Sequence, residues 1–331
     1  MTGGEPLLAV RGLEVEFATP RGTARVLTGV DLDVARGEVV GLVGESGCGK
    51  SVTALAVLRL LRAPGRLAGG RVRFEGRELT TLSEAEMRRV RGRGIAMIFQ
   101  APRESLNPVL TIGQQLGLLL ARHDRLAGAA ARRRAHELAE MVELPDPERV
   151  LRAYPHELSG GMCQRAMLAL ALACRPALLI ADEATTALDV TVQLQILLLL
   201  RRLRETLGLA QLLITHNLGV VAEACQRVAV MYAGEIVETA PVDELFAAPW
   251  HPYTRRLLAA RPRIGAPPEG DPIPGTVPDP LARPSGCPFH PRCHRARADC
   301  AAHHPGLEEL APGRQVRCYY PEPPPDAVEP E

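Results

Sequence analysis

The sequence predicts an α/β fold in which a glycine-rich loop joins a strand to a helix, and three observations support this. Residues 44–51 read Gly-Glu-Ser-Gly-Cys-Gly-Lys-Ser, which fits the phosphate-binding pattern G-x-x-x-x-G-K-S. An apolar run typical of a buried strand precedes the loop at 39–43, and a run typical of a helix follows it at 51–58. Lys50 is the only lysine among 39 Lys and Arg residues, and it stands where a compact ammonium reaches between phosphates.

The glycines of this loop let backbone N–H groups point at phosphates, and the helix N-terminus adds a favourable dipole. We expect Lys50 to reach the β- and γ-phosphates of ATP and the Ser51 hydroxyl to ligate Mg²⁺. The loop residues expected to contact the nucleotide are Gly44, Glu45, Ser46, Gly47, Cys48, Gly49, Lys50 and Ser51.

A second apolar run, at 178–181, ends in Asp182 and Glu183. Asp182 is placed to hold Mg²⁺ through water, and Glu183 is placed to polarise the attacking water. About twenty residues upstream, Ser159-Gly160-Gly161 opens a helical stretch and leaves an uncrowded helix N-terminus, which favours an anion.

Together with three further segments, these motifs have the order and spacing of the ATP-binding subunits of ABC transporters, which the chain resembles. The further segments are Gln100 after an apolar run, Ala187-Leu188-Asp189, and His216 after 212–215. The resemblance implies a P-loop ABC ATPase core with a mixed or parallel sheet, an inserted helical subdomain and a small cysteine-containing C-terminal extension.

The resemblance also implies roles for single residues. Glu183, His216 and Gln100 are the expected catalytic residues, and Gln100 also contacts Mg²⁺ or the attacking water. Asp189 is expected to cross a dimer interface, and Phe17 to stack on adenine. In this family Ser159-Gly160-Gly161 of one subunit faces the γ-phosphate held by the other, so a second ABC ATPase subunit is implied.

Several stretches narrow the resemblance to the oligopeptide/dipeptide importer branch. This branch implies uptake of di- and oligopeptides, or of a related solute such as nickel. It also implies two transmembrane permease subunits, an indirectly coupled extracytoplasmic solute-binding protein, and a heterodimer of ATPases rather than a homodimer. The stretches are Ser105–Pro108, Tyr154–Glu157, 185–191, His251–Thr254 and Ile273–Gly275. The chain departs from the branch at Ala101 and Ala184, where an acidic residue and a proline are usual.

These motifs set the expected domains. Residues 5–250 form the ATP-binding domain with its helical subdomain at about 101–175, 251–320 form the C-terminal extension, and 321–331 form a disordered Pro- and Glu-rich tail.

Four cysteines lie in the C-terminal extension, at Cys287, Cys293, Cys300 and Cys318. Clustered cysteines in a cytosolic chain favour metal or redox chemistry over disulfides. Four thiolates suit a [4Fe–4S] cluster or tetrahedral zinc. Relatives in the branch carry a similar tail, so we expect the cluster, with zinc or a metal-free tail as alternatives.

Cys48 lies beside Lys50 at a helix N-terminus, a setting that lowers the pKa of a thiol. We therefore expect alkylation of this thiol to inhibit ATP hydrolysis and bound ATP to protect it.

The composition restricts the function further. A net charge of +1 argues against a nucleic-acid partner, and no apolar run reaches the length that spans a bilayer. We expect a peripheral protein on the cytoplasmic face of the cell membrane. The alternatives are a soluble ABC ATPase acting on ribosomes or DNA, and a metal-sensing regulator.

Overall fold

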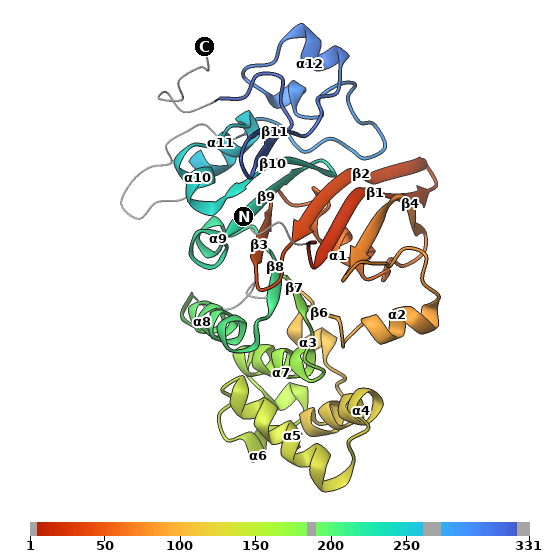
Figure 1. Cartoon of the computed structure of the whole chain (residues 1–331), viewed down its shortest axis with the longest axis vertical. Coiled ribbons are helices and arrows are strands. Elements are labelled where there is room, and N and C mark those ends of the chain that lie inside the picture. The colour runs from red at the N-terminus through yellow and green to blue at the C-terminus, as the bar shows by residue number, and fades with distance from the viewer. Residues whose placement is uncertain (1–4, 184–189, 261–272, 323–331) are drawn as a thin grey trace. The chain divides into compact units, whose positions relative to one another are not determined.

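The computed structural model describes residues 5–183, 190–260 and 273–322 (Figure 1). The chain divides into two units, which are treated separately. The first, called the loop unit here, contains residues 1–34, 39–80 and 215–331. The second, called the helical unit here, contains residues 35–38 and 81–214.

The loop unit begins with an antiparallel sheet of order β2-β1-β4-β5. Val15 of β1 lies opposite Leu27 of β2 and Leu67 of β4, and Val15 and Leu27 are buried. Parts of the strands alternate, as at Val30, Leu32 and Val34 of β2, which are buried, and this is expected for a sheet with one covered face. Its strands are β1 (Leu8–Thr19), β2 (Gly22–Val34), β4 (Gly65–Phe74) and β5 (Arg77–Glu78).

A second sheet of the loop unit carries the glycine-rich loop. Strand β3 (Val39–Val43) is buried along its whole length and runs parallel to β9 (Arg227–Tyr232). Strand β10 (Glu235–Pro241) continues the sheet, followed by β12 (Arg314–Val316) and β11 (Glu308–Ala311). The last two strands come from the C-terminal extension, so the extension is built into the sheet that presents the loop.

Short helices complete the loop unit. Helix α11 (Pro252–Ala259) has proline at its first position and is capped by His251, whose Nδ1 accepts the Tyr253 N–H at 3.0 Å. The other helices are α1 (Lys50–Val57), α9 (Leu218–Ala224), α10 (Val242–Ala247), α12 (Ala298–Ala302) and the 3₁₀ turn η2 (His290–Arg292).

The helical unit has three parallel strands in the order β8-β7-β6. These strands are β6 (Ile95–Ile98), β7 (Leu178–Asp182) and β8 (Ala210–Ile214). All regular structure between residues 102 and 172 is helical. The helices of this unit are α2 (Glu84–Val90), α3 (Pro102–Ser105), α4 (Ile112–Asp124), α5 (Gly128–Met141), α6 (Pro147–Arg152), η1 (Pro155–Glu157), α7 (Gly160–Leu172) and α8 (Val190–Leu207).

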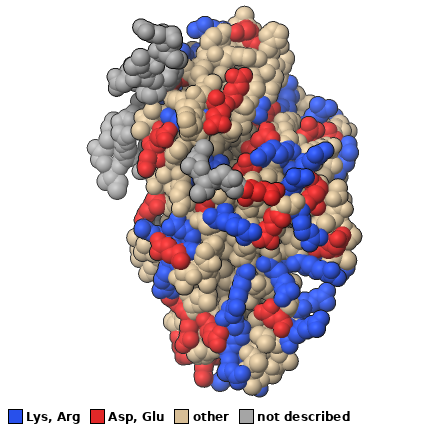
Figure 2. Space-filling model, viewed as in Figure 1, with Lys and Arg blue, Asp and Glu red and all other residues tan. Residues whose placement is uncertain are grey.

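Figure 2 shows basic and acidic side chains intermixed over the displayed face. Ion pairs among the described residues include Arg134 with Glu137 and Arg91 with Glu84. Within the described ranges, every helix is too short or too polar to cross a bilayer.

Candidate functional site

The glycine-rich loop follows β3 and leads into α1, which is the strand–loop–helix order that the sequence predicts. Gly44 has φ 152°, and a Cβ there would lie 2.1 Å from the Met231 carbonyl oxygen. Gly49 has φ 111° and caps α1, and a Cβ there would lie 2.7 Å from the Leu27 side chain. The positive φ favours glycine at both positions, and at Gly44 the Met231 backbone also leaves no room for a side chain.

Lys50 is almost fully buried, with 6% of its surface exposed. Its ammonium donates to the carbonyl oxygens of Gly44 at 2.8 Å and Glu45 at 2.9 Å. These bonds hold the ammonium of Lys50 inside the loop.

Glu45 has contacts from outside its own motif. Its backbone N–H donates to the Tyr253 hydroxyl oxygen at 2.9 Å. Its carboxylate accepts two bonds from the Arg292 guanidinium, at 2.8 and 2.9 Å. Arg292 is buried, and the ion pair raises its pKa. The C-terminal extension therefore reaches the glycine-rich loop directly.

Tyr253 is anchored by a cluster of buried rings. Its ring centroid lies 4.7 Å from that of Tyr232 and 5.4 Å from that of Phe289. His251 closes the cluster beside Phe289, and burial lowers the pKa of its imidazole to about 3. The imidazole is therefore neutral at physiological pH, which leaves its Nδ1 lone pair free to cap α11.

In the helical unit, the structure brings together two of the expected catalytic residues. The Gln100 amide donates to the Glu183 carboxylate at 2.6 Å. Gln100 follows β6 and Glu183 follows β7, and these strands are parallel neighbours, so their carboxyl ends meet at one edge. Glu183 adopts φ 48°, and its N–H donates to the Ile214 carbonyl oxygen at 2.8 Å.

Asp182, the last residue of β7, is buried, with 6% of its surface exposed. Ser159 caps α7, and its hydroxyl accepts the Met162 N–H at 3.3 Å. A Cβ on Gly161 would lie 2.9 Å from the Val192 side chain, so α8 packs closely against this helix start. Gly160 and Gly161 put no side chain at two positions of the first turn of α7, although Val192 of α8 packs against Gly161.

Three other expected site residues lie elsewhere in the loop unit. His216 is exposed just before Asn217, the capping residue of α9. Phe17 is half-buried near the end of β1, with its ring against Gly65, so it also serves as packing. Ser51 is exposed in the first turn of α1. Asp189 and Ala184 lie outside the described residues.

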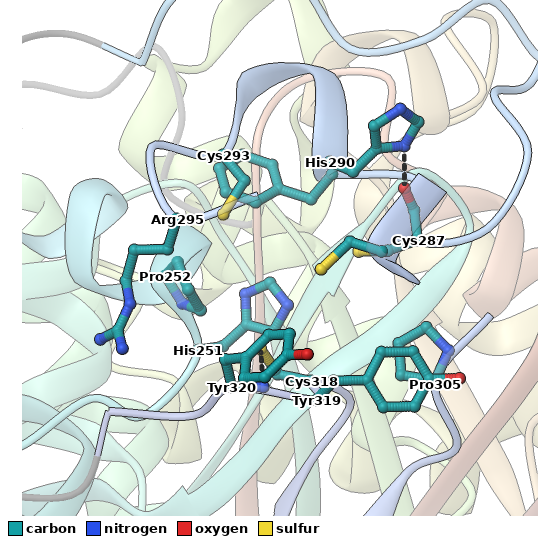
Figure 3. A pocket seen from close by; sticks show the side chains of 12 residues that line it. His251, Pro252, Cys287, His290, Cys293, Arg295, Pro305, Cys318, Tyr319 and Tyr320 are labelled. Carbon is teal, nitrogen blue, oxygen red and sulfur yellow. Dashed lines mark hydrogen bonds between the residues drawn. The ribbon is translucent and has the colours of Figure 1, made fainter. Parts of the chain in front are cut away.

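The four C-terminal cysteines, Cys287, Cys293, Cys300 and Cys318, line one cavity of about 20 Å³ (Figure 3). Figure 3 shows Cys287 and Cys293 turned toward the same space. Burial, together with the neighbouring thiols, raises the pKa of Cys287 to about 11 and that of Cys318 to about 12. Four thiols are, by their chemistry, a donor set suited to iron–sulfur or zinc.

The positions of the four cysteines nevertheless differ from those of a set of metal ligands. Among the described residues, the structure places no three His, Cys, Asp or Glu side chains together closely enough to hold a metal ion. The cavity also holds little more than one water-sized sphere.

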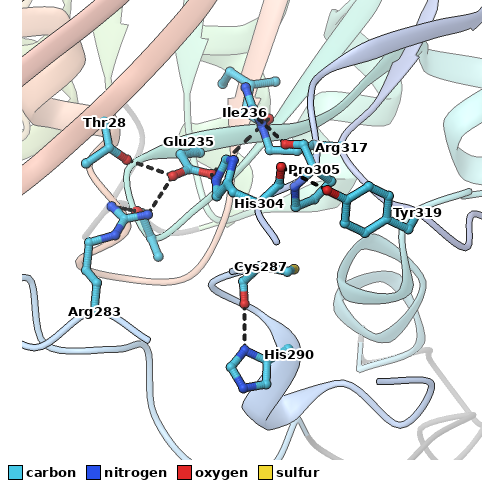
Figure 4. Close-up of polar contacts among 11 residues, drawn as sticks. Thr28, Glu235, Ile236, Arg283, Cys287, His290, His304, Pro305, Arg317 and Tyr319 are labelled. Carbon is cyan, nitrogen blue, oxygen red and sulfur yellow. Dashed lines mark hydrogen bonds and ion pairs between the residues drawn. The ribbon is translucent and has the colours of Figure 1, made fainter. Parts of the chain in front are cut away.

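A buried carboxylate, Glu235, ties the C-terminal extension to strand β2 of the same unit (Figure 4). It accepts bonds from Thr28 at 2.8 Å and Arg283 at 2.6 Å, and it contacts the His304 ring at 2.8 Å. Its pKa is lowered: burial acts against the charged form, and the bonds from His304 and the nearby arginines outweigh it. The network holds the extension against β10 and β2.

The expected lowering of the Cys48 pKa is wrong. Only 1% of this residue is exposed, and burial raises the pKa of its thiol, whereas Lys50 lowers it by a smaller amount. Its neighbours along the sequence indicated a lowered pKa, but burial decides the direction of the shift.

Sequence reasoning also missed Tyr253 and Arg292 as contacts of the loop. The only available signal was that His251–Thr254 and the cysteine region are unusual additions to an ATPase.

Comparisons with known proteins agree with this geometry. Residues 27–186 match the family model for the ABC transporter, and residues 237–300 match that for the oligopeptide/dipeptide transporter C-terminal region. The chain is 53% identical to the probable peptide ABC transporter ATP-binding protein y4tR of Sinorhizobium fredii, covering 95% of this chain and 94% of that protein. It is 47% identical to the dipeptide transport ATP-binding protein DppD of Escherichia coli, covering 95% and 97%.

Solved structures show the same fold. A dimeric ATP-binding cassette in a post-hydrolysis state with ADP and Pi is 28% identical, with a TM-score of 0.64, over 71% of this chain and 98% of that one. The cbiO1 protein of Clostridium perfringens, part of an ABC transporter complex, is 26% identical, with a TM-score of 0.62, over 74% and 92%. With its glycine-rich loop, its Asp182-Glu183 pair and these relatives, the chain belongs to the ABC transporter ATP-binding proteins, in the oligopeptide/dipeptide branch, and is an ATPase.

Proposed function

We propose that this chain is the ATP-hydrolysing subunit of an importer for di- or oligopeptides, working through separate transmembrane subunits. The observation that carries the solute class is the C-terminal region, residues 237–300, which matches the region of oligopeptide and dipeptide transporters. Relatives named for peptide and dipeptide transport, such as y4tR and DppD, align over almost the whole chain.

The proposed chemistry is in-line attack of water on the γ-phosphate of Mg-ATP. Glu183 polarises the water, and the Gln100 amide, which contacts the Glu183 carboxylate at 2.6 Å, links that carboxylate to the nucleotide. Lys50 and Mg²⁺ neutralise the developing charge. Ser51 and Asp182 are the proposed Mg²⁺ ligands, and His216 is the proposed γ-phosphate contact.

The remaining assignments concern the assembly. Ser159, Gly160 and Gly161 would contact the nucleotide of a second ATPase subunit, since they begin a helix whose N-terminus favours an anion. Phe17 would stack on adenine, and Asp189 would cross the subunit interface. The proposed assembly is two unlike ATPases under two permeases at the cytoplasmic face of the membrane. The proposed domains are the ATP-binding domain at 5–250, the C-terminal extension at 251–320 and the tail at 321–331. Most of the tail, 323–331, lies outside the described residues.

The test is reconstitution of the subunit with its permeases, solute-binding protein and partner ATPase in proteoliposomes. A mixture of di- and oligopeptides should stimulate ATP hydrolysis and enter the vesicles, and Glu183→Gln should lower hydrolysis by about 10²–10⁴-fold, because the general base is lost. Glu205→Gln, on the exposed end of α8, is the matched control. Stimulation by nickel but not by peptides would overturn the solute class. Hydrolysis retained in Glu183→Gln would overturn the role of that carboxylate.

We also propose that Cys287, Cys293, Cys300 and Cys318 hold a metal centre, preferably a [4Fe–4S] cluster, with zinc as the alternative. The support is that all four line one cavity. Bound metal would clamp the C-terminal extension. Anaerobic purification with absorbance near 400 nm and iron, sulfide and zinc analysis tests this on wild type and Cys293→Ser. A metal-free wild-type protein would overturn it.

A further inference from the structure

The glycine-rich loop contains one acidic side chain, Glu45, and all its polar groups are held. Its carbonyl oxygen accepts from Lys50 at 2.9 Å, within the loop. Its N–H donates to the Tyr253 hydroxyl oxygen, 208 positions away, at 2.9 Å. Its carboxylate accepts from Arg292, 247 positions away, through both terminal nitrogens. Two of these three groups, the N–H and the carboxylate, are bonded by residues of the C-terminal extension.

Arg292 is fixed in place by further bonds. Its Nε donates to the Pro274 carbonyl oxygen at 2.7 Å, and a terminal nitrogen donates to the Gly275 carbonyl oxygen at 3.3 Å. The other terminal nitrogen contacts the Tyr232 hydroxyl at 3.3 Å. The side chain is 7% exposed, so it has little freedom to leave Glu45. A planar guanidinium held in this way presents a fork that matches the carboxylate.

Because Glu45 lies in the glycine-rich loop, its ion pair with Arg292 affects the binding of phosphates. The loop must accept the negative charge of nucleotide phosphates, and an unpaired carboxylate inside it repels them. In this partly buried setting, repulsion between like charges is weakly screened. Arg292 neutralises that carboxylate, and Tyr253 fixes the direction of the neighbouring peptide group.

We propose that Arg292 and Tyr253 are positioning residues for nucleotide binding: by neutralising and orienting Glu45, the C-terminal extension completes the phosphate-binding loop of its own subunit. Both residues contact Glu45 and act on nucleotide binding through it. The role goes beyond the proposed transport function and holds whatever solute is carried and whether or not the cysteines hold metal.

The test is Mg-ATP affinity, measured by titration of the full-length protein with a fluorescent ATP analogue. Arg292→Gln should weaken binding by roughly tenfold and raise the KM for Mg-ATP with little change in kcat, because it removes charge compensation and no reacting group. Arg292→Lys should lose less affinity for Mg-ATP, since lysine keeps the positive charge but cannot donate two parallel bonds to the carboxylate.

The decisive measurement is the Mg-ATP affinity of a double variant. In Glu45→Gln with Arg292→Gln, the unpaired carboxylate is gone, so affinity should recover toward that of Glu45→Gln alone. A general packing defect would not be rescued in this way. Arg255→Gln, which breaks an ion pair with Glu322 in the same extension, is the matched control and should bind Mg-ATP as wild type does.

Two results would overturn the proposal: wild-type affinity in Arg292→Gln, or no recovery in the double variant. If Arg292→Gln fails to fold, as judged by its thermal unfolding, Tyr253→Phe carries the test. It removes only the oxygen that accepts the Glu45 N–H and should weaken binding about threefold, the loss of about one hydrogen bond. Unchanged binding in Tyr253→Phe would then overturn it.

Discussion

Cys48 forms part of the floor of the glycine-rich loop. Its sulfur lies 2.8 Å from where a Cβ on Gly44 would stand, and its carbonyl oxygen accepts the Gly234 N–H at 2.8 Å. The thiol is thus enclosed by the backbone that shapes the loop. Its place in the loop and its limited access to reagents have the same origin.

This enclosure predicts slow alkylation. At pH 7, N-ethylmaleimide should modify Cys48 at least roughly tenfold more slowly than a free thiol, because burial raises its pKa and reduces the thiolate fraction. Raising the pH should speed the reaction. Peptide mass spectrometry over time measures the rate, with Cys48→Ser as the control. Rapid modification at pH 7 that ATP blocks would contradict the prediction.

At the scale of single elements, α11 depends on a neutral histidine. His251 caps this helix while buried among Tyr253 and Phe289, with Glu238 accepting its backbone N–H at 2.9 Å. Its pKa of about 3 lies below the ordinary 6.5, so the native state binds the proton less well than the unfolded chain. The stabilisation is complete above pH 6.5 and is lost as the pH falls toward 3.

Acidification should therefore lower the free energy of unfolding by up to about 1.4 kcal/mol per pH unit below the ordinary histidine pKa. Urea denaturation at pH 7.5 and 5.5 measures the change. His251→Asn keeps an oxygen that can cap α11 but removes the titration, so its pH dependence should be shallower. Equal slopes in both proteins would exclude His251 as the cause, because other groups, such as Glu238, are common to both.

Local elements were predictable from the sequence because their signals are local. The strands at 39–43 and 178–182 are short apolar runs, and the helices between 102 and 172 follow from composition and periodicity. The contact of Gln100 with Glu183 follows from parallel neighbouring strands once the family is known. Contacts of Glu45 with Arg292 were not predictable, because nothing in either segment specifies a partner 247 positions away. Burial of Cys48 was not predictable for the same reason, since Met231 and Leu27, which enclose the loop, come from strands distant in the sequence.

For the whole molecule, an unusual composition offers a chemical test. Lys50 is the only lysine in the sequence, so it is the only side-chain amine, and it is 6% exposed. Amine acylation of the folded protein should therefore reach Lys50 slowly, and Mg-ATP should slow it further by contacting the ammonium.

Intact-mass and peptide analysis of acylated protein, with and without Mg-ATP, checks this. The urea-unfolded protein is the control, and Lys50 should react freely there. Nucleotide-independent acylation in the folded state would argue against phosphate binding by Lys50.

The Glu45–Arg292 pair limits how such a chain can be recombined. An ATPase cassette cut at residue 250 and joined to another tail would keep an acidic residue in its loop and lose the cation that matches it. Position 45 and position 292 should therefore change together. A related cassette without this extension is expected to have an uncharged residue where Glu45 stands, and inspection of the two positions side by side across such chains would show it.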